Sequence, residues 1–425
     1  MIPRVSGTLV MGSLGELRRD WLGLLRRIGA ECGDIGAFRV GPRTGIVINH
    51  PALAGELLVR HAEHLEKGPL LTRLARLYMG DGLITCPQAS HAAARAHLQP
   101  AFTPRATAAT LPVILACARQ AVRGLEPGQT IDVHAWLTRL AIAVVGRVLV
   151  GDDLDAEVLE RAATDALRDI NHRIRHPLAA PPWWPGRRRR QARATNEALD
   201  RLVAGLVDRR RRGAARDDAL DALLAAPLDD RAIRDHLVTL VLAGFETAAS
   251  HLARTLALLA TRPDIEAEFL QEISSLPDDP TSERLEALAV TGRILEESLR
   301  LYPPAHTLGR KTRVPLTLGG HALTAGSVVL VSPWLLHRRP DLFPEPERFE
   351  PDRFKTAPPR YAMLPFGAGP RICLGARLAS LEARAILVTL ARAVRLIPER
   401  PGLPPAETLM TLRPVDFRAR IEPRR

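Results

Sequence analysis

Residues 366–375, which read Phe366-Gly-Ala-Gly-Pro-Arg371-Ile-Cys373-Leu-Gly375, carry more chemical information than any other stretch of the chain. A cysteine stands in a glycine-rich loop, and a run with helical periodicity follows it over residues 376–392. Unpaired N–H groups at the start of a helix stabilise a thiolate, and Arg371 adds positive charge beside it. Phe366 supplies an apolar plane. The loop therefore predicts a preformed thiolate facing a flat apolar group, for which haem iron with a cysteine axial ligand fits best.

The spacing Phe-x-x-Gly-x-Arg-x-Cys-x-Gly fixes five residue types over ten positions, which makes it far more specific than a single cysteine. The remaining cysteines have no comparable surroundings. A free cysteine usually behaves as a small apolar residue, so we expect inert buried thiols at the other three positions: Cys32, Cys86 and Cys117. Cys373 is therefore the candidate metal ligand.

The loop resembles the haem-binding loop of the cytochrome P-450 family at Phe366, Gly369, Arg371, Cys373 and Gly375. The resemblance runs from about residue 11 to the end of the chain. It implies heme b (iron protoporphyrin IX) as the cofactor and Cys373 as its axial ligand. It also implies that the following loop residues bind the cofactor: Phe366, Gly367, Arg371 and Gly375.

Most of the chain shows helical spacing of apolar residues, interrupted by two extended regions at residues 35–49 and Val314–Ser332. This pattern agrees with the family's fold, a triangular, mainly α-helical domain with a minor β lobe. We expect a single domain over residues 1–425, with β-rich parts at about 35–60 and 305–335 and a helical haem-binding core at about 85–300 and 360–395.

Residues 230–261 read as one long apolar helix whose centre is Ala243-Gly-Phe-Glu246-Thr247. Glycine costs about 1 kcal/mol there relative to alanine, and a buried carboxylate costs more. The segment resembles the family's oxygen-activating motif, Ala-Gly-x-Asp/Glu-Thr-Thr/Ser, with Ala248 departing from its last position. The resemblance implies a local opening of the helix that makes room for dioxygen, with Ala243 among the haem-binding residues. Thr247 would donate a hydrogen bond to the bound oxygen and Glu246 would relay protons from solvent.

Haem propionates need cations or strong hydrogen-bond donors. His91 and Arg95 stand at i and i+4 on a predicted helix, and His91 takes a position where many relatives have tryptophan. Arg310 opens the second β region and matches another propionate-binding position, and Arg371 completes the set. The resemblance therefore assigns these four residues to the propionates.

Glu297 and Arg300 lie one helical turn apart, which is the spacing of an ordinary surface ion pair. The segment that follows, Leu301-Tyr-Pro-Pro304, matches the family's Glu-x-x-Arg region. Arg348 in Pro346-Glu-Arg-Phe349 matches the second arginine of the family's buried triad. Glu297, Arg300 and Arg348 are thus expected to form a structural network behind the haem loop.

The proline-rich stretch His176–Pro185 contains Trp183 and Trp184 and is followed by Arg187–Arg190. An amphipathic helix is predicted from Gln191 to Arg212, with Arg209–Arg212 as its solvated end. The resemblance places this stretch in the connection that roofs the substrate channel. Two interpretations stay open: tryptophans packed beneath a lid, or an aromatic and basic loop resting on a membrane surface.

The 425-residue chain carries a net charge of +12 but shows no zinc spacing, aromatic RNA-binding motif or helix-turn-helix pattern, so no nucleic-acid partner is expected. A basic surface suits an acidic electron-donor protein. No apolar run approaches the ~18 residues needed to cross a bilayer. Four unpatterned cysteines favour a reducing compartment, so we expect a soluble cytoplasmic protein without a transmembrane anchor, and a monomer.

The resemblance implies a haem-thiolate monooxygenase that uses O2 and two electrons from NAD(P)H, delivered by a ferredoxin or flavodoxin and its reductase. Expected pocket-lining stretches are mostly apolar, which suits a terpenoid, fatty acid, steroid or polyketide: residues 70–86, 238–247, 305–308 and 409–410. A peroxide-driven peroxygenase and a non-catalytic haem sensor are the alternatives. The pair Glu246 and Thr247 argues against both, because neither needs an acid and an alcohol to deliver protons to O2.

Overall fold

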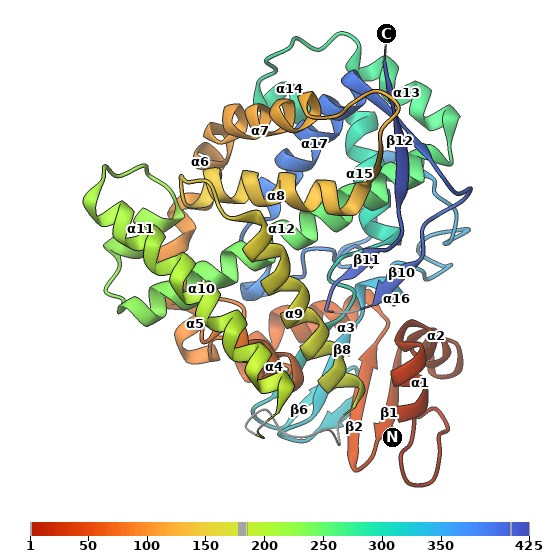
Figure 1. Ribbon diagram of the computed structural model, residues 1–425. Coiled ribbons are helices and arrows are strands. Elements are labelled where there is room, and N and C mark those ends of the chain that lie inside the picture. Colours follow the sequence, from red (N-terminus) through yellow and green to blue (C-terminus); the bar gives the residue numbers. More distant parts are fainter. Residues whose placement is uncertain (1, 177–183, 185, 409, 425) are drawn as a thin grey trace.

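The computed structural model describes residues 2–176, 184, 186–408 and 410–424, with only the backbone described at residues 70 and 71. Figure 1 shows helices stacked across the upper and left parts of the molecule, one group of strands at the bottom, and a further long strand at the upper right near the C-terminus. The N-terminus lies in the β-rich end and the C-terminus at the opposite end (Figure 1). The predicted mainly α-helical fold with a small β portion is confirmed.

The structure has strands beyond the two predicted extended regions, at residues 65–67 and 130–132 and, with breaks, over 394–423. The α-helices are α1 (Leu14–Arg19), α2 (Trp21–Cys32), α3 (Pro51–Gly55), α4 (Pro69–Met79), α5 (Gln88–Leu98), α6 (Pro104–Ala109), α7 (Leu111–Arg123), α8 (Val133–Leu149), α9 (Ala156–Arg175), α10 (Arg187–Arg212), α11 (Ala219–Ala225), α12 (Asp230–Ala260), α13 (Pro263–Ile273), α14 (Ser282–Glu286), α15 (Ala289–Leu301), α16 (Pro333–Leu336) and α17 (Ala376–Ala393). Shorter helical turns are the π-helix η1 (Glu56–Arg60) and the 3₁₀ turns η2 (Ala62–His64), η3 (Gln99–Phe102), η4 (Pro351–Lys355) and η5 (Gly369–Arg371). The strands are β1 (Ile35–Val40), β2 (Arg43–Ile48), β3 (Leu65–Lys67), β4 (Thr130–Asp132), β5 (Leu308–Thr312), β6 (Leu316–Leu318), β7 (His321–Leu323), β8 (Val328–Val331), β9 (Val394–Pro398), β10 (Ala406–Thr408), β11 (Leu412–Pro414) and β12 (Arg418–Pro423).

The largest sheet has the strand order β1-β2-β8-β5-β3 and joins both predicted extended regions. β2 and β8 are parallel, and the other neighbouring strands are antiparallel. The register of β3 against β5 pairs Lys67 with Arg310. Residues directly opposite each other on antiparallel strands project from the same face. The sheet therefore brings two cations from distant parts of the chain together.

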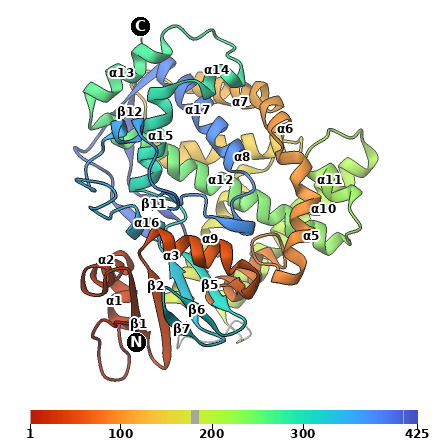
Figure 2. The same cartoon turned by 180° about the vertical axis from the view of Figure 1, so that it is seen from behind.

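Helix α12 crosses the middle of the molecule (Figure 2) and contacts both α8 and α17. It is continuous through Ala243 and Thr247, so the predicted local opening of this helix is not confirmed. Gly244 has a packing reason instead. A Cβ at this position would lie 2.9 Å from Cγ2 of Val145 on α8, so the glycine lets the two helices approach closely.

The two arginine runs of α10 differ from the prediction. The helix begins at Arg187, so Arg187–Arg190 form its exposed first turn and do not belong to a loop. At the other end Arg210 is buried and donates to both carboxylate oxygens of Asp218, at 2.8 and 2.6 Å. The expectation that Arg209–Arg212 are a solvated helix end is therefore wrong for Arg210. Its ion pair with Asp218 connects α10 to the segment before α11.

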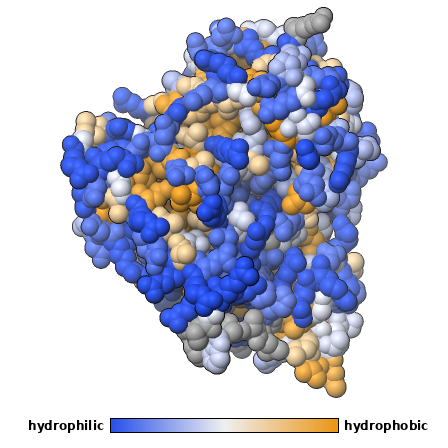
Figure 3. All heavy atoms as spheres, viewed as in Figure 1, coloured by the Kyte–Doolittle hydropathy of each residue, from blue (hydrophilic) through white to orange (hydrophobic). Residues whose placement is uncertain are grey.

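The N-terminal loop ends in an exposed apolar tip, formed by Leu9, Val10 and Met11 and visible at the lower right of Figure 3. Arg39 on β1 holds this tip by donating to the carbonyls of Thr8 and Val10 at 3.0 and 3.1 Å.

Trp184 is also exposed, which contradicts the interpretation that it packs beneath a lid, whereas Trp183 lies outside the described residues. Among the described helices, none is by itself long and apolar enough to cross a bilayer. The bent pair Gln88–Phe102 and Pro104–Arg123, with an angle of 46° between its halves, meets that criterion only when counted together. Membrane contact and cellular location stay predictions.

Candidate active site

The cysteine loop is closed by its own backbone. The Cys373 N–H donates to the Phe366 carbonyl at 2.9 Å, and the Ile372 N–H donates to the Gly369 carbonyl at 3.0 Å. Gly369 has φ of +72°, and a Cβ there would lie 2.0 Å from the Leu58 carbonyl oxygen. Only glycine therefore allows the loop to pack this closely against η1. Helix α17 begins three residues after the cysteine, as the sequence predicts.

The thiol of Cys373 is accessible to solvent even though protein surrounds most of it, and this burial raises its pKa. The Gly375 N–H and the charges of Arg95 and Lys67 act in the opposite direction and lower the pKa less. Arg371 does not contribute in the way the sequence suggested, because its guanidinium donates to the Gln88 side chain and the Cys86 carbonyl. The described surroundings by themselves therefore do not lower the pKa of this thiol, and the preformed thiolate stays a prediction. A metal ion would have to supply the remaining stabilisation, since coordination deprotonates a thiol.

The other cysteines agree largely with expectation. Cys86 and Cys117 are buried, and burial raises the pKa of both thiols. Cys32 is only partly buried, although burial again raises its thiol pKa. None of these three residues is exposed, whereas Cys373 is.

A buried histidine that the sequence analysis missed connects the cysteine loop to α15. The Leu364 N–H donates to Nε2 of His337 at 2.8 Å, and Nδ1 of His337 lies 3.2 Å from the Arg300 carbonyl. Nε2 must accept, so the neutral tautomer carries its proton on Nδ1 and donates to Arg300. Burial lowers the pKa of His337 to about 3, which keeps this tautomer at neutral pH.

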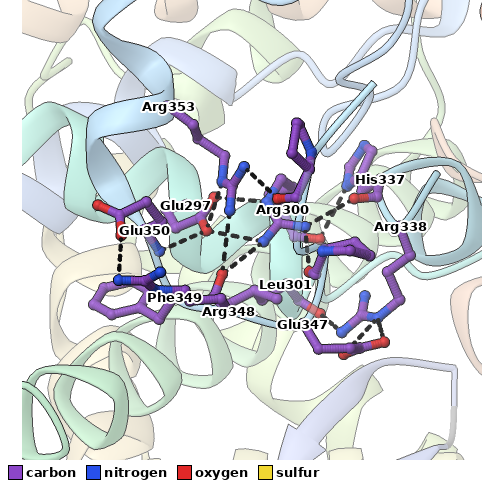
Figure 4. Close-up of polar contacts among 12 residues, drawn as sticks. Glu297, Arg300, Leu301, His337, Arg338, Glu347, Arg348, Phe349, Glu350 and Arg353 are labelled. Carbon is purple, nitrogen blue, oxygen red and sulfur yellow. Dashed lines mark hydrogen bonds and ion pairs between the residues drawn. The ribbon is translucent and has the colours of Figure 1, made fainter. Parts of the chain in front are cut away.

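Arg300 in turn belongs to a network around Glu297, and both of these side chains are completely buried (Figure 4). Nε and Nη2 of Arg300 donate to the two oxygens of Glu297 at 2.6 and 2.8 Å. Glu297 Oε1 also accepts from Nε of Arg353 at 3.0 Å and from the Glu350 N–H at 2.9 Å. This carboxylate thus accepts four hydrogen bonds, three at Oε1 and one at Oε2, which makes it a structural group.

The prediction that Arg348 is the third member of this network is wrong. Its side chain is more than half exposed and pairs with Glu345 and Glu350 on the surface. Only the backbone carbonyl of Arg348 reaches the network, where it accepts from Arg300 at 3.2 Å. Arg353, five residues later in η4, provides the second guanidinium.

The predicted propionate ligands form a cluster of cations on the side of β3, β5 and α5. Arg310 and His91 are buried and Arg95 and Arg371 are partly buried, and Lys67 joins them through the β3–β5 pairing. Burial, followed by the charges of Arg310 and Arg371, lowers the pKa of Lys67 to about 7. Burial and the surrounding cations, Arg371 foremost, lower the pKa of His91 to about 4.

These residues fit the propionate end of a haem. Each cation raises the cost of protonating its neighbours, so the cluster favours a multiply charged anion as partner. Nη1 of Arg371 is buried and has no hydrogen-bond acceptor among the described residues, which suits a carboxylate oxygen from a ligand. Arg95 also donates to the Ile372 carbonyl at 2.7 Å, so the cluster is joined to the loop beside Cys373. Among the described residues no group of three or more His, Cys, Asp or Glu could hold a bare metal ion, whereas a porphyrin supplies four equatorial nitrogens itself.

Helix α12 has one partly accessible face. Between Asp235 and Thr255 most of its side chains are buried, but Leu240, Ala243, Gly244 and Thr247 remain partly accessible. The spacing i, i+3, i+4, i+7 puts them on one stripe of the helix. The Thr247 hydroxyl donates to the Ala243 carbonyl at 2.8 Å, a local bond that also bends helices slightly. These four residues thus form a small accessible surface that carries one hydroxyl group.

Glu246 is buried beside this stripe and contacts a different element. Its Oε1 accepts from the Thr411 hydroxyl at 3.2 Å and lies 4.0 Å from Nη1 of Arg413. Burial raises the pKa of the Glu246 carboxyl, while Arg413 and Thr411 lower it by less. A carboxyl with this balance holds a proton more readily than an exposed one does, and a nearby charge that moves changes that balance.

Most predicted positions come together, but several partners were not foreseen. The sequence holds only weak local signals for these partners. Lys67 is one of three lysines in the chain, and Arg413 stands opposite Glu407 across a short hairpin. The residues found only in the structure are Lys67, His337, Arg353, Thr411 and Arg413.

Comparisons with known proteins agree with this geometry. A family model described as Cytochrome P-450 matches residues 3–417. The chain is 33% identical over 386 residues to cyclooctat-9-en-7-ol 5-monooxygenase of Streptomyces melanosporofaciens, covering 86% of this chain and 83% of the relative. It is 32% identical over 389 residues to cyclooctatin synthase of the same organism, with the same coverage. Pentalenene oxygenase of Streptomyces avermitilis is 30% identical over 436 aligned positions, covering 98% of this chain and 94% of the relative.

Proposed function

Since this chain belongs to the cytochrome P-450 family and is therefore a haem-thiolate monooxygenase with heme b as cofactor, we propose that it oxidises a terpenoid. The reaction inserts one atom of O2 into the apolar substrate, by hydroxylation or epoxidation, in secondary metabolism. The observation that carries the proposal is the similarity to three terpenoid-oxidising relatives across most of each chain. The mostly apolar composition of the predicted pocket-lining stretches supports it.

Haem b, when bound, supplies the iron at which O2 is reduced and its O–O bond is cleaved. Cys373 would hold the iron through Sγ, and Phe366, Gly367 and Gly375 would shape the loop around it. The propionates would be held by four cationic or donating side chains of the cluster, joined by Lys67: His91, Arg95, Arg310 and Arg371. Ala243, a small and partly accessible residue of α12, would contact the haem.

Thr247 and Glu246 hold and transfer protons. The Thr247 hydroxyl, now directed at the Ala243 carbonyl, can rotate and donate toward the reacting oxygen, because that bond is local and the residue is partly accessible. Glu246 holds the proton that replaces the one Thr247 donates. The retained acid and alcohol favour a reaction driven by O2 over peroxide-driven chemistry and over a sensor without turnover.

Electrons come from NAD(P)H through a ferredoxin or flavodoxin and its reductase. Arg377, in the first turn of α17, is exposed and suits an acidic partner near the Cys373 loop. Arg384, further along α17, is half-buried and donates to the Ser380 hydroxyl, so we exclude it from the docking surface.

Spectral titration tests the proposal. Diterpene and sesquiterpene hydrocarbons and alcohols should each be added to the oxidised haem protein, with fatty acids and steroids of similar size as controls. A substrate displaces water from the iron and shifts the Soret band, and that compound should then give an oxygenated product with reconstituted redox partners and NADPH. Binding and turnover only with fatty acids or steroids would overturn the terpenoid assignment. Turnover with hydrogen peroxide alone, at the rate of the reconstituted system, would favour the peroxygenase.

A further inference from the structure

Glu246 is approached by side chains from a part of the chain far from α12. Thr411 and Arg413 both lie near Oε1 of Glu246. Arg413 is on β11, and Thr411 comes directly before this strand. β11 forms a two-stranded antiparallel sheet with β10, in which Glu407 stands opposite Arg413. The C-terminal hairpin therefore delivers a hydroxyl and a cation to one oxygen of the acid.

Arg413 is shared between two carboxylates. Its Nε and Nη2 donate to Oε2 of Glu407 at 2.9 and 2.7 Å, whereas Nη1 lies 4.0 Å from Glu246. The exposed fraction of the side chains rises along this row, from 9% at Glu246 to 15% at Arg413 and 39% at Glu407. The row thus leads from the buried acid to solvent.

The hairpin is fixed to α12 by a second arginine. Arg254, two turns after Glu246 and completely buried, donates to the carbonyls of Pro404 and Pro405 at 2.6 and 2.8 Å. Its guanidinium also lies 4.5 Å from the centre of the Tyr302 ring. These contacts hold the start of the hairpin, so a change at Arg413 requires only a side-chain movement and no displacement of the strands.

We propose that Arg413 is a positioning residue that moves between Glu407 and Glu246 and so decides when Glu246 holds a proton. The inference rests on the proposed function, because it assigns a control to the acid of that reaction. When Arg413 turns to Glu246, it stabilises the carboxylate and the acid gives up its proton. When Arg413 is held by Glu407, the Thr411 hydroxyl is the donor left on Glu246 among the described side chains, and the acid takes a proton up more readily.

Arg413 does not carry the proton, because a guanidinium stays charged. The Thr411 hydroxyl, which donates to Glu246, faces the hairpin side and provides the point at which a proton from solvent reaches the acid. The proton leaves on the other side toward Thr247. Electrostatically, Glu246 is faced by Arg413 and Glu407 from the hairpin. His134 on α8 lies near Arg413 and contacts Ser250, and burial lowers its pKa to about 4, so it is neutral at pH 7.

The direct test is an infrared titration of the Glu246 carboxyl in the oxidised, substrate-free haem protein. The carbonyl band of the protonated acid is assigned by its loss in Glu246→Gln. Arg413→Gln should move the titration of this band to higher pH by about one unit, since a neighbouring cation is removed. Glu407→Gln should move it to lower pH, because Arg413 loses its competing partner. Arg413→Lys should restore much of the shift caused by Arg413→Gln.

A second measurement connects the titration to turnover. The solvent deuterium isotope effect on NADPH-driven product formation should increase about twofold or more in Arg413→Gln, within the range of a proton transfer that becomes rate-limiting. The Glu407 side chain is partly exposed, so Glu407→Gln should stay folded and serves as the reference variant. Its thermal midpoint checks this. Titrations that stay unchanged, or that shift in the same direction in Arg413→Gln and Glu407→Gln, would overturn the proposal. A protein that shows the expected shifts but oxidises no terpenoid would instead refute the proposed function.

Discussion

Two buried glutamates on neighbouring helices, Glu297 on α15 and Glu246 on α12, are both paired with arginines, yet their surroundings differ. Glu297 receives two donors from Arg300, one from Arg353 and one backbone N–H, all within 3.0 Å. Glu246 receives one hydroxyl at 3.2 Å and has its arginine at 4.0 Å. Both side chains are almost inaccessible to solvent.

The difference shows that burial and an arginine partner do not by themselves assign a role to a carboxylate. A carboxylate whose oxygens are saturated with donors stays charged and holds the fold together. A carboxylate with few donors keeps its proton more easily, because nothing offsets the cost of burying its charge. Glu297 is therefore structural, and Glu246 is the group that we propose to exchange protons.

The largest expected effect comes from substituting the two glutamates in parallel. Glu297→Gln leaves Arg300 and Arg353 buried without their counter-charge and should lower the free energy of unfolding by about 3–5 kcal/mol. Glu246→Gln removes a poorly satisfied acid and should change it by less than about 1.5 kcal/mol. Urea denaturation of both variants measures the difference. Equal losses in the two variants would show that the contrast between these glutamates is wrong.

The second effect concerns the hydroxyl beside Glu246. Thr247→Ala should retain the red-shifted Soret band of the reduced carbon monoxide complex, because Thr247 does not hold the haem. Product formation should fall by about 10²-fold, the lower range for loss of a proton donor, and reducing equivalents should appear as hydrogen peroxide. Unchanged product per NADPH would mean that Thr247 is ordinary helix packing.

The third test separates the two candidate arginines of the Glu297 network. Arg353→Ala removes a charged donor from a buried carboxylate and should lower stability by about 1.5–3 kcal/mol. Arg348→Ala serves as its matched control and should stay within about 0.5 kcal/mol, since this side chain pairs only on the surface. Thermal unfolding of both variants decides between them. The reverse order of losses would restore Arg348 as the network residue.

The smallest and most condition-dependent effect concerns exposed arginines. Arg377→Glu should slow ferredoxin-dependent reduction by about tenfold at low salt and flatten its dependence on ionic strength. Neutralising Arg187–Arg190, in the first turn of α10, should leave both quantities unchanged. Reduction rates measured against ionic strength test this. If only the α10 variant loses the salt dependence, that arginine run is the partner site.

The sequence was most informative where the chemistry depends on residues close together in the chain. The cysteine loop, the Ala243–Thr247 motif and the pair Glu297 and Arg300 each lie within one loop or a few turns of one helix. Their spacing alone places the side chains, because helix geometry and glycine conformations act locally. The fold family followed from these motifs.

By itself, then, the sequence determined the family, the haem-ligand candidate, the acid and alcohol on α12 and the mainly helical architecture. Tertiary structure alone decided that Arg353 and not Arg348 completes the Glu297 network, that Lys67 joins the cations, and that Arg413 reaches Glu246 from 167 positions further along the chain. It also decided that burial outweighs the charges around the Cys373 thiol. The physical reason is common to these cases: in a chain so rich in arginine, local spacing cannot say which guanidinium meets which carboxylate, since that depends on how distant strands and helices pack.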